Sequence, residues 1–151
     1  MARTTSSPVP RFVLIANRLT SILLRAGVPL VGPGKAPMYL VTVRGRKSGQ
    51  PRTTPIAVLN QNGNRYVLTP YGVVDWVRNL RAAGEAVLTR ARRAEMVRAT
   101  ELPQSEASLV LKRFMATGNP IGRFFGISAE ASDDEFARTA AAHPVFLLQR
   151  K

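Results

Sequence analysis

Cysteine is absent from this sequence of 151 residues, and histidine occurs once, at His143. Without cysteine the chain has no disulfide, no thiolate nucleophile and no cysteine-based metal site. A single histidine gives no basis for a histidine-ligated metal or a Ser-His-Asp triad, and we read His143, which precedes Pro144, as a helix-end residue. We therefore predict no metal site, and any chemistry must come from other side chains or from a bound cofactor.

Acidic residues are also scarce. The chain has 9 Asp and Glu residues against 22 Lys and Arg residues, which gives a formal net charge of +13. A charge of this size predicts an anionic partner, which is nucleic acid, an anionic membrane surface or a polyanionic small molecule.

Long hydrophobic runs are missing as well. Every apolar run ends short of the ~18 residues that a membrane-spanning helix needs. Arg11, Arg18 and Arg25 recur through the segment where a secretory signal would have an uninterrupted apolar core. The sequence therefore predicts a cytoplasmic protein.

The N-terminal segment divides into an arm and a helix. Residues 1–10 are rich in Ser, Thr and Pro and predict a flexible arm, which leaves residues 11–151 for a single domain. Over residues 11–26 the apolar positions recur at helical spacing, at Phe12, Ile15, Leu19, Ile22, Leu23 and Ala26, beside the three arginines. We expect this amphipathic helix to pack on a sheet; peripheral membrane contact is the alternative.

The remaining chain alternates between strand and helix patterns. Runs rich in β-branched and aromatic residues predict strands over residues 38–44, 54–60, 65–69, 86–90, 95–101 and 145–149. Helices are expected from an N-cap at Asp75 to Gly84, from Pro103 with a stripe of Leu109, Val110, Phe114 and Met115, and over residues 133–142 after a Ser132 capping box. The sum is an α+β fold with antiparallel strands and flanking helices, which indicates a small barrel or a strongly curled sheet.

The turn between the first two predicted strands is strongly basic. Residues 45–55 combine two glycines with Arg46, Lys47 and Arg52, and with the hydroxyl of Ser48. Glycine permits the close backbone approach that an anion-binding loop needs, and the basic side chains supply fixed positive charge. The pattern indicates a phosphate or polycarboxylate site; an ordinary solvated turn is the alternative.

Two motifs carry a resemblance to a known family. The first is Gly45-Arg46-Lys47-Ser48-Gly49 followed by Arg52 and Pro55, and the second is Trp76 with Asn79-Leu80 after the third strand. The pair resembles the deazaflavin-dependent nitroreductases, whose fold is a split β-barrel of the FMN-binding type and whose cofactor is the 8-hydroxy-5-deazaflavin coenzyme F420. The resemblance covers residues 38–149.

The resemblance implies a function and a set of site residues. It implies hydride transfer between coenzyme F420 and a small, largely apolar substrate, which is an activated alkene, a quinone or a nitro compound. Because this coenzyme ends in a phosphate and glutamates, Arg46, Lys47, Ser48, Gly49 and Arg52 would hold that anionic tail. Pro55, Thr69, Pro70, Tyr71 and Gly72 would lie against the rings, and Trp76 and Asn79 would close the pocket. Tyr71 is the hydroxyl that could supply a proton.

The sequence departs from this family at two places. Residues 71–75 form a short loop whose only charge is negative, and Phe124 and Phe125 stand in the C-terminal part where nitroimidazole-reducing members carry tyrosines. The second departure implies an apolar substrate pocket.

Two alternatives use the same barrel. In the first, a basic nucleic-acid-binding barrel contacts phosphates through the same turn and stacks bases on Tyr39, Tyr66 and Tyr71. In the second, the barrel holds FMN or haem, with FMN less favoured than F420. Either a monomer or a homodimer is compatible with the resemblance.

Overall fold

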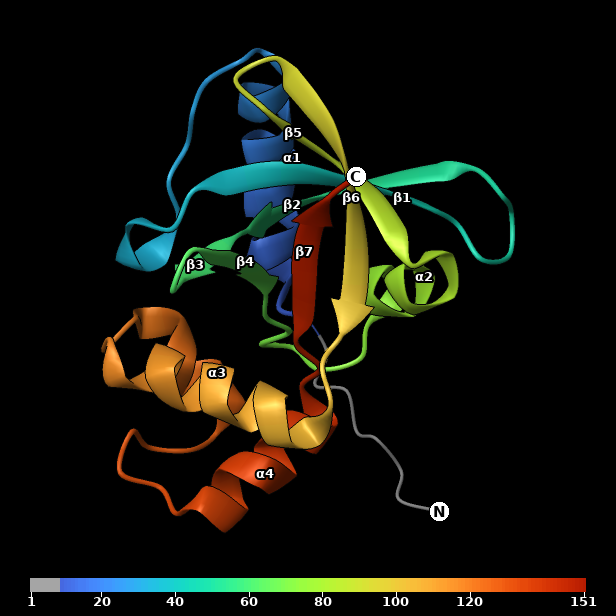
Figure 1. Cartoon of the computed structure of the whole chain (residues 1–151). Helices are drawn as coiled ribbons and strands as arrows, with labels where there is room; N and C mark the ends of the chain where they lie inside the picture. Colours follow the sequence, from blue (N-terminus) through green and yellow to red (C-terminus); the bar gives the residue numbers. More distant parts are fainter. Residues whose placement is uncertain (1–8) are drawn as a thin grey trace.

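A computed structural model describes residues 9–151, so most of the predicted N-terminal arm, residues 1–8, lies outside the described residues (Figure 1). The elements in chain order are α1 (Arg11–Arg25), η1 (Pro33–Lys35), β1 (Met38–Arg44), β2 (Pro51–Ala57), β3 (Leu59–Gln61), β4 (Asn64–Val67), α2 (Asp75–Ala83), β5 (Glu85–Arg90), β6 (Arg93–Glu101), α3 (Gln104–Ala116), η2 (Pro120–Phe125), α4 (Asp133–Ala142) and β7 (Phe146–Arg150).

The strands form one antiparallel sheet in the order β2-β1-β5-β6-β7-β4-β3. The two edge strands of this order, β2 and β3, are separated in sequence only by Val58. A chain that passes from one edge to the other across one residue must bring the two edges together. The sheet therefore curls into a barrel, as the sequence predicts.

The barrel interior is the main hydrophobic core. It contains side chains from β1, β2, β4, β5, β6 and β7, and its fully buried members include Val58, Leu88 and Val97. Helix α2 adds Val77 and Leu80 to the same core, so its position relative to the barrel is fixed by burial of apolar surface.

A second layer packs against the barrel from below in Figure 1, where α3 and α4 lie next to each other. Its core contains Leu111, Phe114, Phe125 and Phe136. The predicted capping box is confirmed, since the Ser132 hydroxyl accepts a hydrogen bond from the Glu135 N–H at 3.2 Å. The predicted stripe of α3 is wrong at Leu109, which is 54% exposed, because the buried face of the helix runs through Ala107, Val110, Leu111 and Phe114.

Two predicted boundaries differ from the structure. The strand predicted over residues 54–60 begins earlier, at Pro51, because Pro51 pairs with Arg44 across the hairpin, and it is interrupted at Val58. Asp75 is the first helical residue of α2 and not its N-cap; the N-cap is Val74, which makes no side-chain capping bond. The Asp75 carboxylate contacts arginine side chains instead.

Helix α1 is confirmed and lies against the sheet as predicted, but most of the apolar positions predicted to face the sheet do not. The helix contacts β1 and β2 and buries Leu24 among its side chains, whereas Phe12, Ile15, Leu19 and Ile22 are exposed. The barrel is already filled by strand and α2 side chains, and α1 lies on its outside (Figure 1). Within the described chain, no helix is both long enough and apolar enough to cross a membrane.

Candidate functional site

The candidate site is the basic hairpin, by which we mean residues 44–52 at the end of β1 and the start of β2. Its turn is closed by hydrogen bonds from the Gly45 N–H to the Gln50 carbonyl, 2.8 Å, and from the Gly49 N–H to the Gly45 carbonyl, 2.9 Å. A β-carbon at Gly45 would lie 2.9 Å from the Ser48 hydroxyl and 3.0 Å from the Gln50 carbonyl. A side chain at position 45 would therefore crowd the turn, which favours glycine there.

Helix α2 anchors the basic hairpin through Arg46. The side-chain carbonyl of Asn79, a residue only 6% exposed, accepts bonds from the Arg46 backbone N–H at 3.2 Å and from Arg46 Nη1 at 2.8 Å. Arg46 Nη2 also lies 3.4 Å from a carboxylate oxygen of Asp75. Because the Asp75 side chain is largely exposed, this ion pair contributes less than the two bonds to buried Asn79.

The position of α2 is fixed at its far end as well. Arg81 forms a bidentate pair with Glu101 of β6, at 2.7 and 2.8 Å, and this hydrogen bonding raises the pKa of the arginine. Gly84 ends the helix in the left-handed conformation, with φ of 68°. The helix that presents Asn79 to the hairpin is therefore held to the barrel by core packing, an ion pair and a glycine cap.

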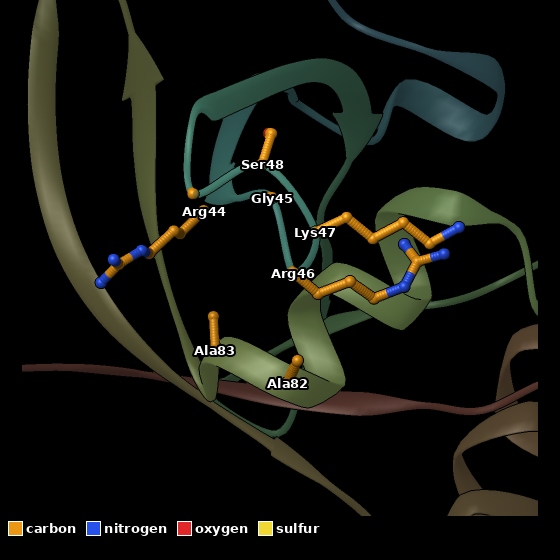
Figure 2. A pocket seen from close by; sticks show the side chains of 8 residues that line it. Arg44, Gly45, Arg46, Lys47, Ser48, Ala82 and Ala83 are labelled. Carbon is orange, nitrogen blue, oxygen red and sulfur yellow. The ribbon is translucent and has the colours of Figure 1, made fainter.

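A cavity of about 440 Å³ lies between the basic hairpin and α2. Its lining consists of Arg44, Gly45, Arg46, Lys47, Ser48 and Gly49 from the hairpin and Ala82 and Ala83 from the helix. In Figure 2, Lys47 and Arg46 extend in one direction along α2, whereas Arg44 points the opposite way. The cavity therefore has cationic groups on both sides and small side chains on its helical wall.

The segment between β4 and α2 is held by the C-terminal part of the chain. The buried Thr69 hydroxyl donates to the Pro144 carbonyl at 2.9 Å, and the Thr69 carbonyl lies 2.6 Å from His143 Nδ1. His143 ends α4, as expected, and its ring stacks edge-on against Phe125. The segment then turns at Gly72 and leads directly into α2.

Tyr71 lies in an aromatic group at the same segment. Its ring centroid is 5.2 Å from that of Phe124, and the Arg123 guanidinium lies 4.9 Å from the Phe124 centroid. Burial raises the pKa of the Tyr71 hydroxyl above 10.0, against an opposing effect of the Arg123 charge. The hydroxyl is therefore protonated at neutral pH.

The structure brings only part of the predicted set together around the cavity. Arg46, Lys47, Ser48 and Gly49 line it, Asn79 holds Arg46, and Arg52 follows the turn, with its Cγ 3.6 Å from where a Gly45 β-carbon would stand. Pro55, Thr69, Pro70, Tyr71, Gly72 and Trp76 do not line the cavity; Trp76 packs against the barrel core.

Sequence reasoning missed three residues of the cavity lining, Arg44, Ala82 and Ala83. Arg44 carried a signal, since it is a basic residue directly before the Gly-rich turn. The two alanines carried none, because their role depends on which face of α2 meets the hairpin.

The donor set fits an anionic group. Three cationic side chains and the backbone of a tight glycine turn line an open cavity, and none of its lining residues is acidic. The exposed Asp75 carboxylate, at the N-terminal end of α2, pairs with Arg46. Arginine, lysine and turn N–H groups are the protein groups that bind phosphates and carboxylates. Such a site suits the phosphate and carboxylate end of a cofactor.

Solved structures share this fold. An F420-H2 dependent reductase, FDR-A, matches with a TM-score of 0.54 and 19% sequence identity, over 80% of this chain and 97% of that chain. A domain-swapped dimer matches with a TM-score of 0.56 and 18% identity, over 93% of this chain and 100% of that chain. A candidate 5-nitroimidazole antibiotic resistance protein from Bacteroides thetaiotaomicron matches with a TM-score of 0.53 and 13% identity, over 89% of this chain and 78% of that chain.

The curled antiparallel sheet and its flanking helices define the class of fold, which is a split β-barrel, as the sequence predicts. The family described as F420H(2)-dependent quinone reductase matches residues 19–120, more than half of the sequence. The chain belongs to this family, and it is an oxidoreductase whose cofactor is coenzyme F420. None of the curated protein sequences matches the chain.

Proposed function

We propose that the basic hairpin holds the anionic tail of coenzyme F420 while the chain reduces a small, largely apolar substrate. The substrate classes are a quinone, an activated alkene or a nitro compound. The observation that carries the proposal is the cavity between the hairpin and α2, because its cationic lining matches a phosphate and carboxylate tail. Lys47 supports it further, since no acidic side chain in residues 9–151 pairs with its ammonium group.

The roles of the other site residues belong to the same proposal. Arg46, oriented by Asn79, lines the cavity, and Arg52 adds positive charge at the start of β2. The segment Thr69, Pro70, Tyr71 and Gly72, together with Pro55 and Trp76, lies against the ring system. Half-buried Trp76 supplies a flat apolar surface at the start of α2.

The chain needs few reactive side chains for this chemistry. When bound, the reduced coenzyme supplies the hydride, so the protein must bind, orient and exclude water. A proton must still reach the reduced substrate, and we assign the Tyr71 hydroxyl as its donor. That hydroxyl is protonated at neutral pH and lies beside Phe124, which gives the neighbouring surface an apolar character.

Tyr71→Phe removes the proposed proton donor and keeps the ring that packs on Phe124. We expect the turnover number to fall about a hundredfold, the lower end of the range for general acid catalysis, with little change in cofactor affinity. Because burial raises the pKa of Tyr71, the wild-type rate should show no Tyr71 titration between pH 6 and 9. An unchanged turnover number in Tyr71→Phe would remove Tyr71 from the mechanism.

Turnover with defined acceptors tests the function. Absorbance of the reduced coenzyme is followed with a quinone, an activated alkene and a nitro compound, each with and without protein. We expect protein-dependent oxidation with the apolar quinone or alkene to exceed that with a polar nitro compound. Failure of all three acceptors, in the presence of demonstrated coenzyme binding, would overturn the proposed substrate class.

The nucleic-acid alternative finds no support in the arrangement of the tyrosines. Tyr66 is buried in the core, Tyr39 is half-buried beneath the Arg90 guanidinium, and Tyr71 packs on Phe124. Bases stack on exposed aromatic faces, which these three residues do not share. We therefore propose a cofactor and a small molecule as the partners.

The remaining parts of the proposal concern organisation. Residues 11–151 act as one domain, in the cytoplasm, as a monomer or a homodimer. Similarity in fold to a domain-swapped dimer supports the second of these states. We also propose that α1 makes peripheral contact with a membrane, because three arginines lie beside its apolar residues.

A further inference from the structure

One carboxylate contacts the basic hairpin and has no role in the proposed function. Among the ion pairs of residues 9–151, only that of Asp75 involves a cation of the hairpin. Its Oδ1 lies 3.4 Å from Arg46 Nη2 and also 3.4 Å from Nη1 of Arg78, three residues further along α2. One carboxylate oxygen is therefore shared between a residue of the cavity lining and an arginine outside it.

Arg46 differs from the other cations that line the cavity. Its Nη1 donates to the side-chain carbonyl of Asn79 at 2.8 Å, and its Nη2 faces Asp75. Arg44 and Lys47, by contrast, have no acidic partner in residues 9–151. An anion that enters the cavity therefore meets two cations without a carboxylate partner and one that a carboxylate of the chain already contacts.

We propose that Asp75 is an internal competitor for Arg46, which weakens the grip of the basic hairpin on the anionic tail and lets the cofactor leave. This inference rests on the proposed function of the hairpin. A phosphate or carboxylate of the tail that reaches Arg46 Nη2 must displace the Asp75 carboxylate. The Asp75 side chain is 84% exposed, and ion pairs this exposed are weak, so the displacement is readily reversed.

Arg78 gives the displaced carboxylate a second partner. Because Asp75 and Arg78 are three residues apart on one helix, the carboxylate can leave Arg46 and keep a cationic contact. Asp75 also lies in the first turn of α2, where the helix dipole favours negative charge. Both effects keep the carboxylate close to Arg46, so it returns when the tail leaves.

Exchange of the cofactor is a requirement of the proposed chemistry. Each catalytic cycle passes a hydride, with its two electrons, to the acceptor and leaves oxidised coenzyme in the site. The proposed reaction has no second reductant, so reduced coenzyme must replace the oxidised form before the next cycle. A hairpin without a competing carboxylate would hold the anionic tail longer and slow this replacement.

Asp75→Asn removes the competing charge and keeps the size of the side chain. We expect the variant to bind complete coenzyme F420 about threefold to fivefold more tightly than wild type, mainly through slower dissociation. The deazaflavin core without the phosphate and glutamates should bind both proteins equally, because it lacks the tail that competes for Arg46. Fluorescence titration gives the dissociation constants, and stopped-flow displacement gives the dissociation rates.

Two matched variants separate competition from a change in net charge. Asp134→Asn removes a negative charge from the exposed first turn of α4, away from the hairpin, and should leave coenzyme affinity unchanged. Asp75→Glu keeps a carboxylate beside Arg46 and should bind the coenzyme like wild type. Equal gains in Asp75→Asn and Asp134→Asn would overturn the inference, because net charge alone would then explain them.

A double-variant cycle with Arg46→Gln tests whether Asp75 acts through Arg46. We expect Asp75→Asn to tighten coenzyme binding much less in the Arg46→Gln background than in wild type. The same gain in both backgrounds would contradict competition for this arginine. Circular dichroism confirms that each variant is folded.

The variant Lys47→Ala with Arg52→Ala distinguishes failure of this inference from failure of the proposed function. If that variant binds the coenzyme more weakly while Asp75→Asn binds it no more tightly than wild type, the role of Asp75 is refuted and the hairpin keeps its proposed function. If the Lys47 and Arg52 variant keeps full affinity, the proposed function fails, and the role of Asp75 fails with it.

Discussion

The double variant Lys47→Ala and Arg52→Ala is expected to bind coenzyme F420 about a hundredfold more weakly than wild type. A hydrogen bond to a charged group contributes roughly 1.5–3 kcal/mol, so the loss of two corresponds to at least this factor. Both side chains are exposed and neither has an acidic partner in residues 9–151, so folding should be unaffected. Titration of the coenzyme's fluorescence measures the dissociation constant directly.

Arg113→Ala with Arg138→Ala is the control for the loss of charge. These arginines are exposed on α3 and α4, away from the basic hairpin, and removing them changes the net charge equally. We expect an affinity within about threefold of wild type, since distant exposed charges are screened. A hundredfold loss in this control would show that overall charge, and not the hairpin, holds the cofactor.

Asn79→Ala should have the second large effect, on both stability and binding. It removes the nearly buried acceptor that the Arg46 backbone N–H and Nη1 share. Each hydrogen bond contributes about 0.5–1.5 kcal/mol net, so the loss of the two should lower the free energy of unfolding in urea by about 1–3 kcal/mol. Affinity for F420 should also fall, because the hairpin loses two of its hydrogen bonds to α2.

Asn79→Asp is the conservative comparison, since it keeps an oxygen acceptor at the same place. A carboxylate there can accept both Arg46 bonds and gains charge attraction from the guanidinium. We expect its unfolding free energy to stay within about 1 kcal/mol of wild type. If Asn79→Asp lowers the unfolding free energy as much as Asn79→Ala does, the cause is packing at position 79 and not the loss of the Arg46 acceptor.

The parts of the fold that follow local rules could be predicted from the sequence. Strand β1 has its predicted bounds, Gly84 ends α2 in a left-handed conformation, and the Ser132 hydroxyl caps α4. In each case the signal lies within a few residues of the feature, as β-branched content, a glycine or a capping pair. The motif pair indicated the family for the same reason, because both halves are short and contiguous.

Features that depend on contacts across space could not be predicted. The pairing of Arg46 with Asn79 joins positions 33 residues apart, and it requires knowing which face of α2 meets the hairpin. The exposure of Ile15 and Leu19 depends on whether the barrel has room for another apolar face, which the pattern of α1 alone does not reveal. Ala82 and Ala83 enter the cavity lining only through the same packing.

The central claim is that the basic hairpin holds the anionic tail of the cofactor, and a thermodynamic cycle tests it most directly. Dissociation constants are measured for wild type and for Lys47→Ala with Arg52→Ala, each with complete coenzyme F420 and with the deazaflavin core lacking the phosphate and glutamates. We predict that wild type binds the complete coenzyme far more tightly than the core, and that the variant loses most of this preference. An equal loss of affinity for both ligands in the variant would contradict the claim.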